Sequence, residues 1–342
     1  MTGLNLTRPR ARQAFTGPAY APRKPHNPGA ETSRRISGAV RRQGWLFLGV
    51  AAAVASLGLL VAMAERSLDA NAVLFWSGVG ACVGFALAAL RELGRETIVS
   101  AARLGKQRNF TVLGAAPELS GATLRELPPD QRTPLGCLAF LPASPFATAF
   151  RDLQGAFARD GLVAFLSSAD DEGAAMTAMC AAASAAQQGR RVIVVDCDLR
   201  RRALTHEMGI EPDMGVLEAI SGAKPWGEVV GQEPETGLSY IPLLASNKAI
   251  RSLAEAPGFP ALLASLREGY DLVALSCPPV AAGGAELAAR ADKIIVVAAW
   301  DETTFAALRG AWRLLPRNAK ARPGLFVCRV PAGRRFGRLR AG

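Results

Sequence analysis

Two apolar runs enclose residues whose spacing is typical of a phosphate-binding loop. The stretch from Phe165 to Leu199 reads FLSSADDEGAAMTAMCAAASAAQQGRRVIVVDCDL, an apolar run, a Ser/Gly turn, an Ala-rich helix and a second apolar run. In such a loop Gly-Lys-Ser/Thr opens the helix, where the lysine reaches the β- and γ-phosphates and the hydroxyl holds Mg²⁺. Here the three positions are Gly173, Ala174 and Ala175. The pattern therefore predicts the frame of a nucleotide site without two of its ligand-holding side chains.

The loop carries acidic side chains where a nucleotide needs cations. Asp170, Asp171 and Glu172 precede the glycine, and no lysine occurs between Lys106 and Lys224. Three carboxylates without an adjacent cation repel a triphosphate, and the lost lysine contact alone is worth roughly 1.5–3 kcal/mol. The sequence thus predicts a degenerate phosphate loop that consists of Ser168, Glu172, Gly173, Ala174 and Ala175.

The second apolar run ends in another acidic motif. Asp196 and Asp198 are followed directly by Arg200, Arg201 and Arg202. Two carboxylates at the end of one strand could bind a divalent ion weakly. Alternatively, they cap the strand end and pair with one of the arginines. The second role is favoured.

Alternating strands and helices are expected to position these residues. The apolar runs are continuous, which is typical of parallel strands covered by helices on both faces. Ligands of such sheets lie at the carboxyl ends of the strands, at a switch point of the topology. Strands are expected at 162–167, 191–197, 239–244, 270–276, 293–300 and 324–330, and helices at 144–160, 173–188, 216–220, 250–268, 285–290 and 303–315.

The N-terminal part predicts a membrane hairpin. Residues 45–64 and 70–90 are uncharged runs of about twenty residues, each long enough to cross the hydrocarbon core. Only the five residues ERSLD lie between them. Arginines flank the pair on its outer sides, so the positive-inside rule places both termini in the cytoplasm. Gly80 and Gly84 form a G-x-x-x-G step that permits close helix packing. Two buried helices of a soluble fold are the alternative.

Composition limits the partners. The formal net charge is +11, and the basic residues gather at the two ends of the chain. These ends are solvated tails or contacts for anionic lipid headgroups. Nucleic acid is not expected as a partner, because no aromatic residues interleave with the arginines. The six cysteines occur singly, which favours buried, reduced thiols over a disulfide framework or a zinc site.

These features give a division of the chain into five parts. Residues 1–43 form a disordered basic tail, 44–91 the membrane hairpin, 92–143 a connector, 144–331 an α/β domain and 332–342 a basic C-terminal tail. The expected fold class is α/β, a doubly wound parallel sheet of the P-loop-NTPase type preceded by a two-helix transmembrane hairpin.

The order of the segments carries a resemblance to a known family. SPFATAFRDLQ, FLSSADDEG, VIVVDCDLRRRALTHEMG, GVLEAISG, GYDLVALSCPPV and GLFVCRV follow one another from residue 144 onward. In this order they resemble the cytoplasmic domain of the bacterial tyrosine kinases, the autokinases of capsule and exopolysaccharide export. The hairpin followed by TVLGAAPEL is similar to the membrane-proximal part of polysaccharide co-polymerases.

The resemblance implies roles for particular positions, and several of these positions hold a different residue from the one in the family. It implies catalytic and metal-binding roles for Asp196, Asp198 and the neighbouring Arg200, which are present. The metal-organising aspartate at the end of a strand is matched by Ser276, and the adenine-contacting asparagine by Cys328. The C-terminal cluster of acceptor tyrosines is absent, since the chain has only three tyrosines, at positions 20, 240 and 270.

The function expected from this resemblance is that of a membrane-anchored, inactive kinase-like subunit supporting exopolysaccharide or capsule biosynthesis and export. Its partners would be a co-polymerase subunit with a periplasmic domain and the polysaccharide assembly complex. No cofactor is expected. An active tyrosine autokinase, which would use ATP and Mg²⁺, is one alternative. A membrane-tethered relative of the partitioning and positioning ATPases is the other.

Overall fold

The computed structural model describes residues 52–54, 56, 58, 75, 76, 78–83, 97, 98, 110–158, 161–244, 252–316 and 323–331. The chain separates into two compact units, Lys24–Glu96 and the remainder. Most of the predicted hairpin and both basic tails lie outside the described residues. Within the described part, none of the helices combines the length and the apolar character that crossing a bilayer requires.

An eight-stranded sheet forms the centre of the α/β unit, in the order β1-β8-β7-β2-β6-β3-β5-β4. All neighbouring strands pair in parallel except β4 and β5, which are antiparallel. The predicted parallel sheet is thereby confirmed for its central strands. The strands are β1 (Thr111–Pro117), β2 (Leu162–Ser167), β3 (Val192–Asp196), β4 (Gly231–Gln232), β5 (Ser239–Ile241), β6 (Leu272–Ser276), β7 (Lys293–Ala299) and β8 (Gly324–Val330).

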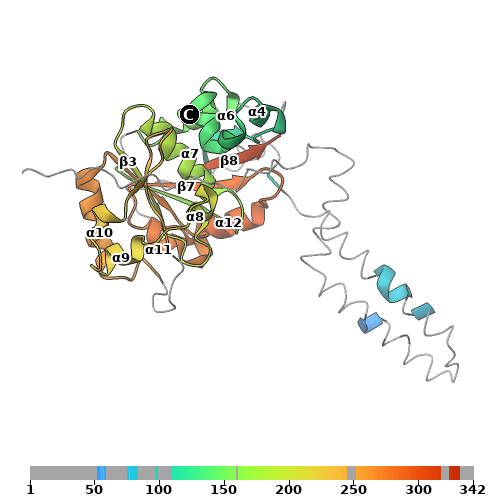
Figure 1. Cartoon of the computed structure of the whole chain (residues 1–342). Helices are drawn as coiled ribbons and strands as arrows, with labels where there is room; N and C mark the ends of the chain where they lie inside the picture. Colours follow the sequence, from blue (N-terminus) through green and yellow to red (C-terminus); the bar gives the residue numbers. More distant parts are fainter. Residues whose placement is uncertain are drawn as a thin grey trace, which may run out of the picture. The chain divides into compact units, whose positions relative to one another are not determined.

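Helices cover both faces of the sheet, as Figure 1 shows. One apolar cluster packs α5, α6, α7 and α8 on one face, and a second packs α9, α10, α11 and α12 on the other. The helices are α4 (Gly121–Arg125), α5 (Pro134–Phe140), α6 (Pro145–Gln154), α7 (Ala174–Ala186), α8 (Ala203–Met208), α9 (Val216–Ile220), α10 (Gly258–Gly269), α11 (Gly284–Ala288) and α12 (Phe305–Leu314). The arrangement is the doubly wound fold expected from the alternation of strands and helices.

Two predicted helices are shorter in the structure by several residues. The helix expected at 144–160 ends at Gln154. The helix expected at 250–268 begins only at Gly258. The reason in the second case is Pro260, which lacks a backbone N–H and is tolerated only in the first turn of a helix. A Cβ at Gly258 would lie 1.9 Å from the carbonyl oxygen of Ile220, so this start also needs glycine to pack against α9.

The segment interpreted as a connector contributes to the sheet. Residues 111–117 form β1, which pairs in parallel with β8 at the edge of the sheet. Leu135 and Leu138 of α5 are buried in the cluster on the α7 face. The α/β unit therefore includes part of residues 92–143, whose short apolar run was hidden among turn residues.

Candidate functional site

The acidic motif and the loop meet at the carboxyl ends of three central strands. Strand β6 lies between β2 and β3, and its last residue, Ser276, is in register with Phe165 on one side and Asp196 on the other. The β2–α7 loop begins after Ser167, directly beyond this rung. The sequence-predicted positions in the loop, at Asp196 and at Ser276 are thus brought together, where doubly wound sheets place their ligands.

Glu172 fixes the shape of the β2–α7 loop from inside. Its side chain is only 6% exposed. One carboxylate oxygen accepts the backbone N–H groups of Ser168 at 2.8 Å and Ala169 at 3.0 Å. The other accepts the hydroxyl of Thr303 at 2.8 Å, from the turn after β7. Burial raises the pKa of this carboxyl above its ordinary value, although these hydrogen bonds oppose the shift. Glu172 therefore holds the loop together and fastens it to the turn after β7.

The N-terminus of α7 faces the loop without a capping side chain. Gly173 adopts a left-handed φ of 85°, and no described side chain caps the helix. A Cβ at this glycine would lie 2.9 Å from the sulfur of Cys328, so a close approach of β8 also requires glycine. Cys328 is fully buried, and its thiol donates to the carbonyl oxygen of Glu172. The adenine position implied for Cys328 stays a prediction; in the structure this residue packs beneath the loop.

Asp196 belongs to a buried hydrogen-bond network. One of its oxygens accepts the backbone N–H and the hydroxyl of Thr205, at 2.9 and 2.7 Å, and the other accepts the backbone N–H of Asp198. The hydroxyl of Thr205 in turn accepts the backbone N–H of Leu243. Burial raises the pKa of Asp196 to about 6 despite these donors. The network connects β3, α8 and the end of β5, which gives this aspartate a role in the fold.

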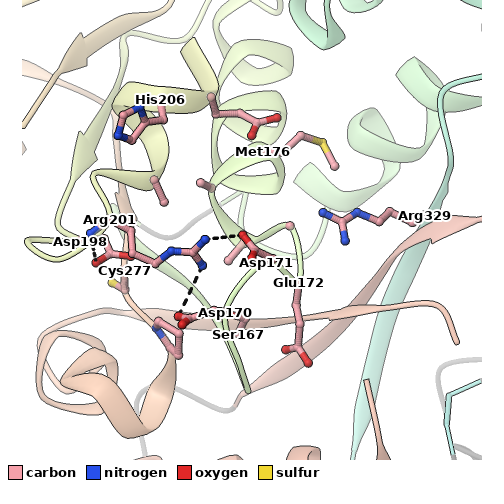
Figure 2. A pocket seen from close by; sticks show the side chains of 16 residues that line it. Ser167, Asp170, Asp171, Glu172, Met176, Asp198, Arg201, His206, Cys277 and Arg329 are labelled. Atoms are coloured by element: carbon pink, nitrogen blue, oxygen red, sulfur yellow. Dashed lines mark hydrogen bonds and ion pairs between the residues drawn. The ribbon is translucent and has the colours of Figure 1, made fainter. Parts of the chain in front are cut away.

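Asp198 caps the turn that follows β3. The side chain is 3% exposed, and its Oδ1 accepts the backbone N–H groups of Arg200 and Arg201, each at 3.1 Å. This agrees with the structural alternative, in which the carboxylates cap the strand end. The arginine side chain is directed elsewhere: Arg201 pairs with Asp171 at 2.5 Å and Asp170 at 3.5 Å in the opposite loop, as Figure 2 shows.

A pocket of about 280 Å³ lies between these two segments. Its walls come from the β2–α7 loop, the first turn of α7, the turn after β3 and α8. Figure 2 shows carboxylates and two arginines around it. The pocket is lined by Ser167, Asp170, Asp171, Glu172, Gly173, Ala174, Ala175, Met176, Asp198, Arg201, Ala203, His206, Glu207, Cys277, Pro279 and Arg329.

The residues present do not fit a nucleoside triphosphate with Mg²⁺. Ala174 and Ala175 place methyl groups where such a loop supplies its lysine and hydroxyl. Ser276 replaces the expected carboxylate, is fully buried, and finds no hydrogen-bond partner for its hydroxyl among the described residues. In the part of the chain that the structure describes, no three His, Cys, Asp or Glu side chains are grouped to hold a metal ion.

The sequence did not place three contributors at this site. Arg201 was one of three candidate partners for the Asp-x-Asp motif, and its reach to the opposite loop had no local signal. Thr303 was read as the start of a helix, and only the tertiary fold brings its hydroxyl to Glu172. Arg329 of β8, which itself has a left-handed φ of 59°, also lines the pocket and pairs with Glu302.

Comparison with known proteins identifies similar sequences. Tyrosine-protein kinase EpsB of Ralstonia nicotianae is 31% identical over 168 residues, which are 46% of this chain and 22% of EpsB. The succinoglycan biosynthesis transport protein ExoP of Rhizobium meliloti is 28% identical over 173 residues, 47% of this chain and 22% of ExoP. The chromosome-partitioning ATPase Soj of Thermus thermophilus is 34% identical over 155 residues, 45% of this chain and 59% of Soj. No protein-family model matches the chain.

Solved structures give the same fold. The kinase domain of the Escherichia coli tyrosine kinase ETK aligns with a TM-score of 0.60 at 19% identity, covering 71% of this chain and 100% of that domain. The chain spans less than a third of the length of the tyrosine-kinase relatives that it matches by sequence. In sequence, the α/β domain is thus similar to bacterial tyrosine-protein kinases, and it shares the fold of their kinase domains.

Proposed function

We propose that the chain is a membrane-anchored, catalytically inactive tyrosine-kinase-like subunit that supports exopolysaccharide or capsule biosynthesis and export. The observation that carries this proposal is the first turn of α7, where Ala174 and Ala175 border the pocket. Phosphoryl transfer depends almost entirely on positioning and on stabilising charge around the phosphates. A loop with methyl groups at these two positions supplies neither.

Other parts of the same reaction support the proposal independently. Ser276 leaves no carboxylate at the end of β6, and its hydroxyl has no partner in the described structure. Asp196 is engaged by Thr205 and Asp198, so its carboxylate is committed to the fold. Tyr240 is 5% exposed, which makes it a poor phosphate acceptor without unfolding. Loss of several elements of one reaction favours a role in binding over one in catalysis.

The membrane anchor and the partners are further parts of the proposal. The charge-free runs at 45–64 and 70–90 support a two-pass anchor in the inner membrane, with the α/β domain in the cytoplasm. The short loop between them leaves a periplasmic co-polymerase domain to a separate subunit. ExoP, by its name a biosynthesis transport protein, supports a place in a polysaccharide assembly complex. The basic tails would contact anionic lipid headgroups.

Nucleotide binding by the full chain is the direct test. We expect the purified protein to bind ATP–Mg²⁺ with a Kd weaker than about 100 μM, between the micromolar and millimolar marks of the affinity scale. Isothermal titration with a catalytically competent relative as the positive control would measure it. Tighter binding would overturn the proposal. Co-purification from native membranes then tests the partner, and the expected companion is a subunit with a periplasmic domain.

Two competing functions have observations in their favour. Similarity to EpsB favours an active tyrosine autokinase. Labelled phosphate on Tyr20, Tyr240 or Tyr270 that disappears in Asp196→Asn would support it. Similarity to Soj favours a partitioning-type ATPase. ATP hydrolysis by the full chain, in the absence of any tyrosine phosphorylation, would support that reading and exclude the subunit role.

A further inference from the structure

One arginine connects the two segments that enclose the pocket. Arg201 follows β3, whereas Asp170 and Asp171 belong to the loop between β2 and α7. One guanidinium nitrogen lies 2.5 Å from Asp171 and another 3.5 Å from Asp170. Figure 2 shows the guanidinium crossing the pocket between the carboxylates. A single side chain thus connects the two segments that line the pocket.

The backbone on the arginine side is held in place before the ion pairs form. Asp198 is buried and accepts the N–H of Arg201 itself, at 3.1 Å. Asp198 belongs to the same strand end as Asp196, which the Thr205 network fixes. Less conformational entropy is lost when a side chain on a fixed backbone forms an ion pair. The hydrogen bond to Asp171 also raises the pKa of the guanidinium, so its charge persists at every relevant pH.

The loop side requires a cation. Asp170 and Asp171 are adjacent, and like charges this close repel each other. Asp171 in addition has a φ of 62°, a conformation that costs free energy in residues other than glycine and that aspartate tolerates better than most. Glu172 fixes the base of the loop but makes no contact that neutralises these two carboxylates. A guanidinium that serves both of them offsets the repulsion.

We infer that Arg201, with Asp170 and Asp171, is a latch that holds the loop closed without a nucleotide and makes its closure depend on ionic conditions. This inference rests on the proposed function, since an inactive domain needs another source of order at this loop. In a working phosphate loop the anion is the ligand and the loop is cationic. Here the loop carries the anions, and the cation comes from the opposite segment.

The strength of the latch follows from its exposure. The side chains of Arg201, Asp170 and Asp171 are 35%, 49% and 74% exposed. Exposed ion pairs contribute little and are screened by salt. Loss of the latch should therefore increase local opening of the loop by about five-fold and leave the global fold unchanged. Raising sodium chloride from about 0.05 to about 1 M should have a similar effect, because the Debye length falls to roughly 3 Å.

Hydrogen exchange of the full chain without nucleotide tests the latch. Amides 168–173 should exchange about five-fold faster in Arg201→Gln than in the unmodified protein. Arg200→Gln is the matched control. It removes the same charge from the neighbouring residue, whose side chain does not line the pocket. Arg201→Lys keeps the charge without the two-pronged geometry and should fall between them.

The outcomes separate the latch from the proposed function. The double variant Asp170→Asn, Asp171→Asn should accelerate loop exchange as Arg201→Gln does, and combining all three changes should add little further effect. High salt should accelerate exchange in the unmodified protein but not in Arg201→Gln. Equal exchange in Arg201→Gln and Arg200→Gln would overturn the latch. That result would leave the ATP titration untouched, and tight ATP binding would overturn the function whatever the exchange data show.

Discussion

The β2–α7 loop and the turn after β3 lie on opposite sides of one pocket, and they hold their carboxylates in different ways. At the end of β3 and directly after it, Asp196 and Asp198 are buried and accept hydrogen bonds from their own segment and from α8. In the β2–α7 loop, Asp170 and Asp171 are exposed and pair with an arginine from the other side. One segment is part of the core, and the other depends on contacts across the pocket.

Under the proposed function, this difference gives a structural reason for Asp196 and Asp198 to be kept when the loop at the start of α7 has no lysine. A change at Asp196 would disturb the packing of β3 and α8, so the aspartate has a structural reason to remain even without chemistry. Ala174 and Ala175, at the start of α7, line the pocket, and their methyl groups take no part in such a hydrogen-bond network. The presence of Asp196 and Asp198 is therefore weak evidence for catalysis, because both carboxylates also have a structural role.

The substitution with the largest expected effect on stability is the removal of the Asp196 carboxylate. In Asp196→Ala the backbone N–H groups of Asp198 and Thr205 and the hydroxyl of Thr205 lose their acceptor. Because unpaired buried donors are costly, we expect a loss of about 3–4 kcal/mol in the free energy of unfolding, measured by urea denaturation. Asp198→Ala, which frees two less buried amides, should cost about 1 kcal/mol. Equal losses would contradict the distinction between the two carboxylates.

The same carboxylate predicts a pH dependence. The folded-state pKa of Asp196 is raised from 3.8 to about 6, so the folded protein binds its proton more tightly than the unfolded chain. The stabilisation from protonation is complete below about pH 4 and is lost as the pH rises through 6. The shift of about two pKa units corresponds to a loss of roughly 3 kcal/mol in the free energy of unfolding. The stability difference between the unmodified protein and Asp196→Asn should fall by this amount from pH 4 to pH 7. A constant difference would show that the residue does not titrate in this range.

Glu172 gives the intermediate effect, because it belongs to the loop but is buried like the β3 carboxylates. Glu172→Ala removes the acceptor of Ser168 N–H, Ala169 N–H and the Thr303 hydroxyl. We expect a loss of about 2 kcal/mol in thermal or urea unfolding. Glu172→Gln retains an acceptor and should lose less than about 1 kcal/mol. A larger loss in the glutamine variant would mean that the negative charge itself, and not the hydrogen bonds, holds the loop.

The fold was largely predictable from the sequence, because its signals are local. The strands at 162–167 and 324–330 and the helix at 216–220 have the predicted bounds, since continuous apolar runs of that length fit a covered sheet. The early start predicted for α10 was wrong, because Pro260 fits only the first turn of a helix. Strand β1 was missed, because an edge strand needs fewer apolar residues than a central one.

The candidate site was predictable in its positions and not in its contacts. The changed residues, Ala174, Ala175 and Ser276, are visible in the sequence and lie together in the structure. The bonds that give the site its present form join residues far apart in the chain, such as Glu172 with Thr303 and Asp171 with Arg201. No periodicity or spacing encodes such pairs, because either partner alone looks like an ordinary loop residue.

The smallest expected effect concerns Ser276, which lies in the same rung as Asp196 but takes no part in its network. Its hydroxyl is buried and has no partner within the described structure, so removing it removes only a desolvation penalty. Ser276→Ala should therefore be neutral or stabilise the protein by up to about 1 kcal/mol. Thr177→Val, at another buried hydroxyl without a described partner, is the control and should behave alike. If Ser276→Ala instead costs more than about 1 kcal/mol while Thr177→Val does not, the hydroxyl binds a ligand or a water, and the rung between the two loops still has a polar function.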